Sequence, residues 1–340
     1  MQQNKVLLSD IAIMRPILII SIILGHSFAM FGGSASWPLL ECVRQIDSYG
    51  WITPTLISFA LQAFVFVSGY LFAYKNPNSA PPVYKSKFMY SRAKRILVPS
   101  VIFSVLYVLL LTPQSFNKVS VVFEIVNGAG HLWFLPMLFW CYTFGVLFYN
   151  CVKKPSVIVG ALLLIFSFAS FVLPDYLRIA LGIHYFPYFV LGMWTFSNKN
   201  KILDWINKRK YLLLLLWIIV IILCVCKVKY SSFLYIPEFF MPIIKVTINI
   251  MLGLFGSMAL WSTINIILND GRVVRVRGDI WFGLYIYHQF IMMWLYYHTV
   301  LPNNVCAEWL PWVCFALTFV SSYLLVVLTL KSRIGRWLIG

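Results

Sequence analysis

The stretch WLPWVCFALTFVSSYLLVVLTL, residues 309–330, contains no charged residue. A helix of about 20 mainly apolar residues is long enough to cross the hydrocarbon core of a bilayer. Its apolar residues form one continuous run instead of alternating with polar ones, which favours a helix over a strand of a membrane barrel. This stretch therefore predicts a transmembrane helix.

Nine other segments of the chain have a similar apolar character. Because a membrane-spanning helix satisfies its own backbone hydrogen bonds, such segments pack together as a helical bundle. We therefore expect an all-α membrane protein with a single domain over residues 1–340, built as a bundle of about ten transmembrane helices. The nine other helices are predicted at residues 11–31, 55–74, 96–112, 132–150, 156–173, 183–196, 211–226, 239–268 and 280–299.

The overall composition agrees with a membrane protein. The chain is 61% hydrophobic and 11% charged, whereas soluble domains carry about 25% charged residues. So few charges do not cover the surface of a water-soluble particle of 340 residues. The composition therefore excludes a soluble enzyme, a disordered chain and a nucleic-acid-binding domain.

The positive charges are distributed unevenly among the predicted loops. With a cytoplasmic N-terminus, 20 of the 27 Lys and Arg residues fall in inner segments and five fall in outer loops. Cytoplasmic loops of membrane proteins carry such an excess of Lys and Arg. The distribution predicts that both termini are cytoplasmic, and it accounts for most of the net charge of +17 without a polyanionic partner.

Two ionisable residues lie within the first predicted helix, Arg15 and His26. Eleven helical steps come to about 1100°, close to three full turns, so the two side chains share one face about 16 Å apart along the axis. Ionisable groups inside membrane helices mark function by default. Arg15 and His26 are interpreted either as an anion-binding entrance and a buried base, or as a cation extending to the lipid surface and a structural histidine.

Six motifs follow one another along the chain. The first runs from Asp10 through Arg15 to His26, and it is followed by FVFVSGYLF (64–72), RAKRILVP (92–99), HLWFL (131–135), YFPY with LG (185–192) and FGLYIYH (282–288). Together they resemble the acyltransferase-3 family, whose members are integral-membrane acyltransferases that modify cell-surface glycans. The resemblance extends over nearly the whole chain.

The resemblance implies O-acyl transfer, most often of acetyl, from cytoplasmic acyl-CoA (acetyl-CoA) to a hydroxyl group. The implied acceptor is a cell-surface or exopolysaccharide glycan or its lipid-linked precursor, at the bacterial inner membrane. His26 is expected as the base, aided by Arg15, because an imidazole takes up and returns a proton near neutral pH. Direct attack and a transient acyl-imidazole remain open, as does a homo-oligomer. The alternatives are acylation of a small molecule, succinylation included, and a polyprenyl-glycan transporter without catalysis.

The phosphates of the implied donor require a cytoplasmic cationic site. Guanidinium groups bind phosphate through two parallel hydrogen bonds, so we expect Arg92 and Arg95 to hold them, together with Arg15, Lys85 and Lys87 in the same basic region. This region is expected to be a loop that leads into the third helix. The alternative is that these charges only anchor that helix at the inner surface.

Five other residues are candidates for binding the acyl group or the acceptor. Each also has a structural interpretation, as a residue of helix packing, of the aromatic belt at the outer surface, or of the bundle interior. No spacing of His, Cys, Asp or Glu predicts a metal site. The five candidates are Ser68, Tyr70, His131, Trp133 and His288.

Overall fold

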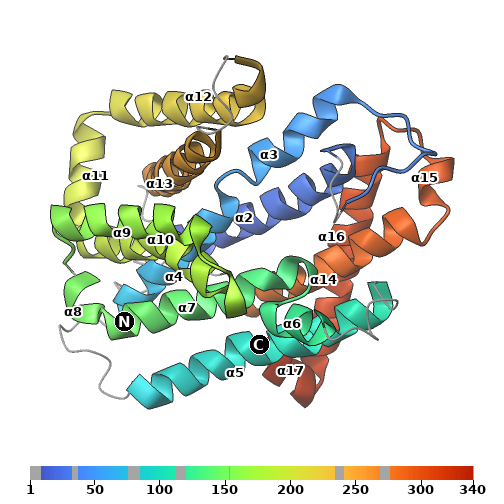
Figure 1. The fold of residues 1–340 in the computed structure, drawn as a ribbon, viewed down its shortest axis with the longest axis horizontal. Coiled ribbons are helices and arrows are strands. Elements are labelled where there is room, and N and C mark those ends of the chain that lie inside the picture. The colour runs from blue at the N-terminus through green and yellow to red at the C-terminus, as the bar shows by residue number, and fades with distance from the viewer. Residues whose placement is uncertain are drawn as a thin grey trace.

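The computed structural model describes residues 9–32, 37–75, 85–111, 120–152, 154–233, 241–268 and 276–339. Within these ranges the secondary structure is helical and no β-strand occurs (Figure 1). The longer helices are α2 (Ser9–Ser27), α4 (Ala60–Lys75), α5 (Lys85–Leu111), α7 (Phe134–Leu147), α9 (Val157–Ala169), α10 (Ile179–Ser197), α12 (Tyr211–Phe233), α13 (Met241–Ile267), α14 (Gly278–Tyr297) and α16 (Leu310–Lys331).

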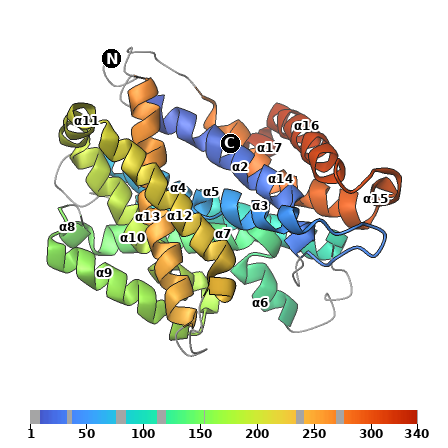
Figure 2. The ribbon, with the colours of Figure 1, turned by 90° about the horizontal axis from the view of Figure 1, so that it is seen from above.

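Shorter helical pieces connect or extend the long ones. They are η1 (Ala29–Gly32), η2 (Asp47–Trp51), α3 (Ile52–Leu56), α6 (Ser120–Asn127), η4 (Gly130–Trp133), α8 (Tyr149–Val152), η5 (Ser170–Val172), η6 (Tyr176–Arg178), α11 (Lys199–Lys208), α15 (Leu301–Asn304) and α17 (Arg333–Ile339). Two views place α14 and α16 on one side of α2, and α8, α9 and α10 on the other (Figure 1 and Figure 2). The helix α2 therefore lies between these two groups of helices.

Each of the ten predicted ranges overlaps one of the longer helices, with ends that differ by up to about eleven residues. In the described part of the chain, seven helical segments are long and apolar enough to cross a membrane. An eighth is added if α11 and α12, which are bent by 98° relative to each other, form one span. The 13-residue α9 is too short to qualify, and α14, which is rich in Tyr and also carries His and Gln, lies outside this set.

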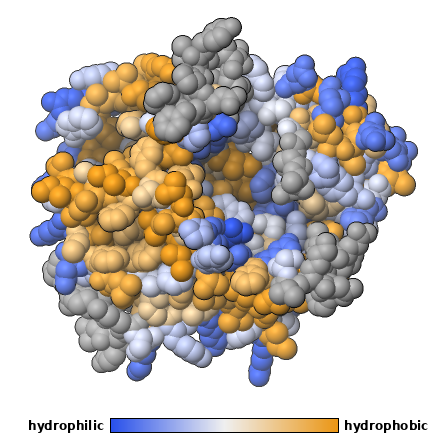
Figure 3. Space-filling view, in the orientation of Figure 1, coloured by the Kyte–Doolittle hydropathy of each residue, from blue (hydrophilic) through white to orange (hydrophobic). Residues whose placement is uncertain are grey.

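The exterior of the molecule is apolar where a soluble protein would be polar. Figure 3 shows hydrophobic residues gathered on the side of α9 and α10. On α9, Val157 is 91% exposed and Ile158 is 72% exposed. Exposed apolar surface of this extent marks an interaction site or a lipid contact, and together with the long apolar helices it makes this a multi-pass integral membrane protein.

The helices α4 and α10 pack against each other at the closest distance that a glycine allows. A Cβ atom on Gly69 would lie 1.9 Å from the backbone oxygen of Phe189, and one on Gly192 would lie 2.0 Å from that of Phe66. Small residues at such crossings let helix backbones approach in a membrane. This contact holds the 64–72 motif in the interior of the bundle.

A buried carboxylate joins four helices. Asp10 of α2 accepts hydrogen bonds from the Tyr70 hydroxyl of α4 at 3.3 Å and the Trp261 indole of α13 at 3.0 Å. It also forms an ion pair with Lys199 of α11 at 2.9 Å. Buried charges are tolerated when they are paired and hydrogen-bonded in this way, and the cluster holds the start of α2 in place.

The basic segment before the third span is helical and not a loop as expected from the sequence. The helix α5 begins at Lys85 and continues to Leu111, so residues 85–95 form its first three turns. Lys, Arg and Met favour helices, and no Gly or Pro occurs between Lys85 and Pro99. The basic side chains therefore project from a helix of defined direction.

Candidate active site

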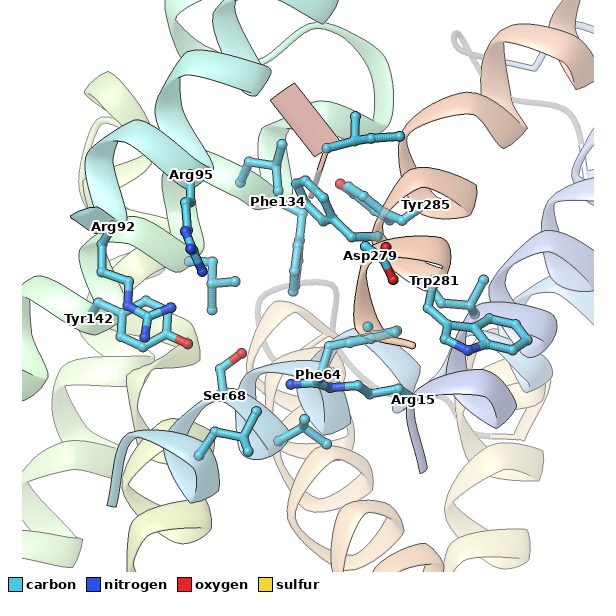
Figure 4. A pocket seen from close by; sticks show the side chains of 18 of the residues that line it. Arg15, Phe64, Ser68, Arg92, Arg95, Phe134, Tyr142, Asp279, Trp281 and Tyr285 are labelled. Carbon is cyan, nitrogen blue, oxygen red and sulfur yellow. The ribbon is translucent and has the colours of Figure 1, made fainter. Parts of the chain in front are cut away.

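A cavity of about 430 Å³ opens at one end of the bundle, between α2, α4, α5, α7 and α14. Its lining includes Arg15 of α2 and Ile339 at the end of α17. Residues of α2 and α17, which lie near the two ends of the described chain, thus meet at this cavity. Figure 4 shows Arg92 and Arg95 facing Arg15 and Asp279 across the cavity.

Four cations line this cavity: Arg15, Lys75, Arg92 and Arg95. The one acidic residue in the described lining, Asp279, forms an ion pair at 2.6 Å with the exposed Arg277. Within the described ranges, none of the four cations forms an ion pair with a carboxylate. Their charge is therefore available to an anion that enters the cavity.

Arg92 is held in position by aromatic rings. Its guanidinium carbon lies 5.0 Å from the ring centroid of Phe88 and 4.7 Å from that of Tyr142, in the range of a cation–π contact. The Nε atom of Arg92 is buried and has no hydrogen-bond partner in the described structure. A buried N–H without a partner is costly, so this arrangement suits a ligand that supplies an acceptor.

Part of the cavity lining is apolar. It includes Ile19 of α2, Phe64 of α4, and Phe134 and Leu138 of α7, and Tyr285 of α14 also lines the cavity. Ile19 and His26 are seven residues apart on α2, or about 10 Å of helix rise, and Tyr285 and His288 are three apart on α14, or about 5 Å. His26 and His288 lie further along these helices than the cavity lining.

Three histidines meet in the interior beside Tyr285 of the cavity lining, whose ring centroid lies 5.2 Å from that of His131 and 6.0 Å from that of His288. The Nδ1 atom of His26 lies 3.1 Å from the Nε2 atom of His288. The His131 ring centroid lies 4.8 Å from that of His288, and its Nε2 atom lies 3.0 Å from the backbone oxygen of Ile286. His131 is 7% exposed and His288 is fully buried. The structure thus joins residues of α2, η4 and α14 that are far apart in the sequence.

These positions match some of the residues expected from the sequence and not others. Arg15, Ser68, Arg92 and Arg95 line the cavity. Lys87 is exposed on α5 and lies outside the cavity lining, and the side chain of Lys85 lies outside the described residues. Lys87 therefore differs in position from the two arginines with which it was grouped.

The five candidates for acceptor or acyl binding also differ in where the structure places them. Tyr70 does not face the cavity, because its fully buried hydroxyl donates to Asp10. His131 is buried against α14, which favours the bundle interior over the aromatic belt at the outer surface among its structural interpretations. Trp133 is partly buried, with its ring 6.1 Å from that of Tyr185.

Sequence reasoning missed three polar or charged residues of the cavity: Lys75, Tyr142 and Asp279. Lys75 is the last residue of α4. In the sequence it counted only as one of the inner charges, although its place after the 64–72 motif puts it at the predicted cytoplasmic end of that helix. Tyr142 and Asp279 carried no local signal, since each reaches the cavity through helix packing. In the described ranges, no group of three or more His, Cys, Asp or Glu side chains is arranged to hold a metal ion.

Comparison with known proteins identifies the family. The model of the acyltransferase 3 family, described as an acyltransferase domain, matches residues 8–331. No curated protein and no solved structure matches the chain. The matched range contains the four cavity cations and the three histidines. The chain therefore belongs to the acyltransferase 3 family of membrane acyltransferases.

Proposed function

We propose that this protein moves an acetyl group from cytoplasmic acetyl-CoA to a hydroxyl of a cell-surface or exopolysaccharide glycan, or of its lipid-linked precursor. The proposed setting is the bacterial inner membrane, with ten spans and both termini in the cytoplasm. The observation that carries the proposal is the cavity lined by four cations without a carboxylate partner in the described ranges, together with the histidine cluster that adjoins its Tyr285.

The cation set suits the phosphates of a coenzyme A thioester. Arg92 and Arg95 present guanidinium groups from one helix face, three residues apart, and such groups bind phosphate oxygens in pairs. Lys75 and Arg15 add positive charge from α4 and α2. The apolar part of the lining, which includes Phe64, Phe134 and Leu138, fits an uncharged arm that extends from the phosphates.

His26 is the proposed base. In this scheme it takes the proton of the acceptor hydroxyl as the oxygen attacks the acyl carbon, and it returns a proton to the leaving thiolate. The cations bind the donor and hold its acyl carbon next to the acceptor hydroxyl. The transfer then proceeds between groups that are already positioned, which lowers its entropic cost. Succinyl transfer and a small-molecule acceptor would use the same residues, so the product decides between them.

Exchange of His26 tests this proposal. His26→Ala is expected to insert and fold normally and to lower glycan acetylation by about 10²- to 10⁴-fold, the usual contribution of a general base. The control is His298→Ala, which alters an exposed histidine at the end of α14. Acetyl groups on the glycan are measured by NMR in cells that produce each variant at equal level.

Two outcomes would contradict the proposal. Wild-type acetylation by His26→Ala would remove the residue from catalysis. If the glycan of wild-type cells is unmodified and small molecules carry the acyl group, the acceptor is a small molecule and not a glycan.

A further inference from the structure

We propose that His288 is a positioning residue that holds His26 in the tautomer with its proton on Nδ1. This leaves the Nε2 atom of His26 unprotonated as the atom that accepts the proton, an inference that rests on the proposed function for the role of that atom. It follows from hydrogen-bond geometry on α14 and α2.

The first step concerns the Nδ1 atom of His288. It lies 2.6 Å from the backbone oxygen of Tyr285 and 3.3 Å from that of Leu284. A carbonyl oxygen only accepts hydrogen bonds, so the Nδ1 atom of His288 carries the proton. Both carbonyls belong to the preceding turn of the same helix, which keeps this contact independent of the packing of other helices.

The second step concerns the charge of His288. Its side chain is fully buried, and in the described ranges no carboxylate is hydrogen-bonded to His26, His131 or His288. A buried charge without a partner is strongly unfavourable, so the imidazole is neutral. A neutral imidazole has one N–H, and that proton is on Nδ1. The Nε2 atom of His288 is therefore an acceptor.

The third step transfers this constraint to His26. The 3.1 Å contact between the two rings joins the Nε2 atom of His288 to the Nδ1 atom of His26. Since the first atom accepts, the second must donate. His26 then carries its proton on Nδ1 and has an unprotonated Nε2 atom, which forms no hydrogen bond with the described residues.

This arrangement also stabilises the charge that forms during the reaction. When the O–H bond of the acceptor breaks and its oxygen bonds to the acyl carbon, the proton moves to the Nε2 atom of His26. The imidazolium keeps its Nδ1–H bond to the neutral His288 and needs no second proton transfer. When the carbon–sulfur bond breaks, the same proton passes from Nε2 to the thiolate, and His26 returns to its starting state.

His131 supports His288 from the other side. Its ring packs edge-on against His288 with 4.8 Å between centroids. The His131 backbone oxygen accepts from the Tyr285 hydroxyl at 2.5 Å, and its Nε2 atom donates to the Ile286 backbone oxygen. These contacts tie η4 to the turn of α14 that carries His288 and leave that ring little freedom to rotate.

Solid-state ¹⁵N NMR of histidine-labelled protein in lipid measures the tautomer directly. Because the chain has only five histidines, their signals can be assigned one by one. The His26 signals are assigned by their loss in His26→Gln. We expect a protonated Nδ1 and an unprotonated Nε2 in the wild type, and a shift towards Nε2–H, the tautomer that free histidine prefers, in His288→Leu. His184, which bonds to Ser167, is the internal control. A protonated Nε2 on neutral His26 in the wild type, or an unchanged tautomer in His288→Leu, overturns the proposal.

Kinetics provide a second measurement. His288→Leu is expected to lower kcat by about 10²-fold or more with little change in KM for acetyl-CoA. His288→Gln should recover part of kcat, since an amide oxygen can accept from the Nδ1–H of His26. The matched control is Tyr287→Phe, which removes a hydrogen bond to Thr329 of α16 from the residue next to His288 in the sequence. Equal kcat losses in His288→Gln and His288→Leu would contradict the positioning role.

These measurements separate the two proposals. Full acetylation by His26→Ala would refute the role of His26 as the base, whereas the NMR measurement of its tautomer would remain valid. A wild-type tautomer with Nε2–H would refute the role of His288 while loss of activity in His26→Ala still supports the base.

Discussion

At the residue scale, substitution of the arginines of α5 tests donor binding independently of the transfer step. Arg92→Ala combined with Arg95→Ala removes two of the four cations from the cavity. A hydrogen bond to a charged group contributes about 1.5–3 kcal/mol, so we expect affinity for coenzyme A to fall by at least about tenfold. Titration of detergent-purified protein with coenzyme A measures the change.

The control for this pair lies on the same turn. Lys94 has the same charge, and its ammonium group packs over the ring of Trp337 outside the cavity lining. Lys94→Ala is expected to keep wild-type affinity. If the double variant also binds coenzyme A normally, the arginines only anchor α5 at the inner surface.

At the element scale, the crossing of α4 and α10 depends on Gly69. A methyl group at this position would overlap the backbone oxygen of Phe189, which lies 1.9 Å from the ideal Cβ position, and a backbone cannot move aside as a side chain does. We expect Gly69→Ala to destabilise the protein by about 1–3 kcal/mol or more. A lowered apparent melting temperature in detergent shows this effect.

Gly160 provides the comparison, because a Cβ atom there meets nothing within 4 Å. Gly160→Ala in α9 is expected to leave the melting temperature unchanged or to raise it slightly, since Ala favours helices over Gly. Equal melting temperatures for Gly69→Ala and wild type would mean that α4 and α10 are further apart than described.

At the scale of the whole molecule, the orientation in the membrane can be read from native cysteines. Cys42, Cys151 and Cys306 are free and exposed. The charge distribution places Cys42 and Cys306 outside and Cys151 inside. With each as the single remaining cysteine, a membrane-impermeant thiol reagent is expected to label Cys42 and Cys306 in intact cells and Cys151 only after permeabilisation. Labelling of Cys151 in intact cells would invert the proposed topology.

The helical membrane fold and part of the cavity follow from local sequence. Continuous apolar runs require helices in lipid because each backbone group must be bonded within its own segment. Arg15 shares one face of α2 with His26 through helix periodicity alone. Arg92 and Arg95 share a face of α5 for the same reason, even though the basic segment proved to be helix and not loop.

The sequence by itself predicted a helical membrane protein, one helix face shared by Arg15 and His26, and a basic region of which Arg92 and Arg95 line the cavity. Only the tertiary structure decided that Tyr70 faces Asp10, that Lys75 joins the arginines, and that His288 contacts His26 from 262 positions away. The physical reason is that helix periodicity relates residues a few turns apart, whereas contacts between helices depend on how side chains of every neighbouring helix pack.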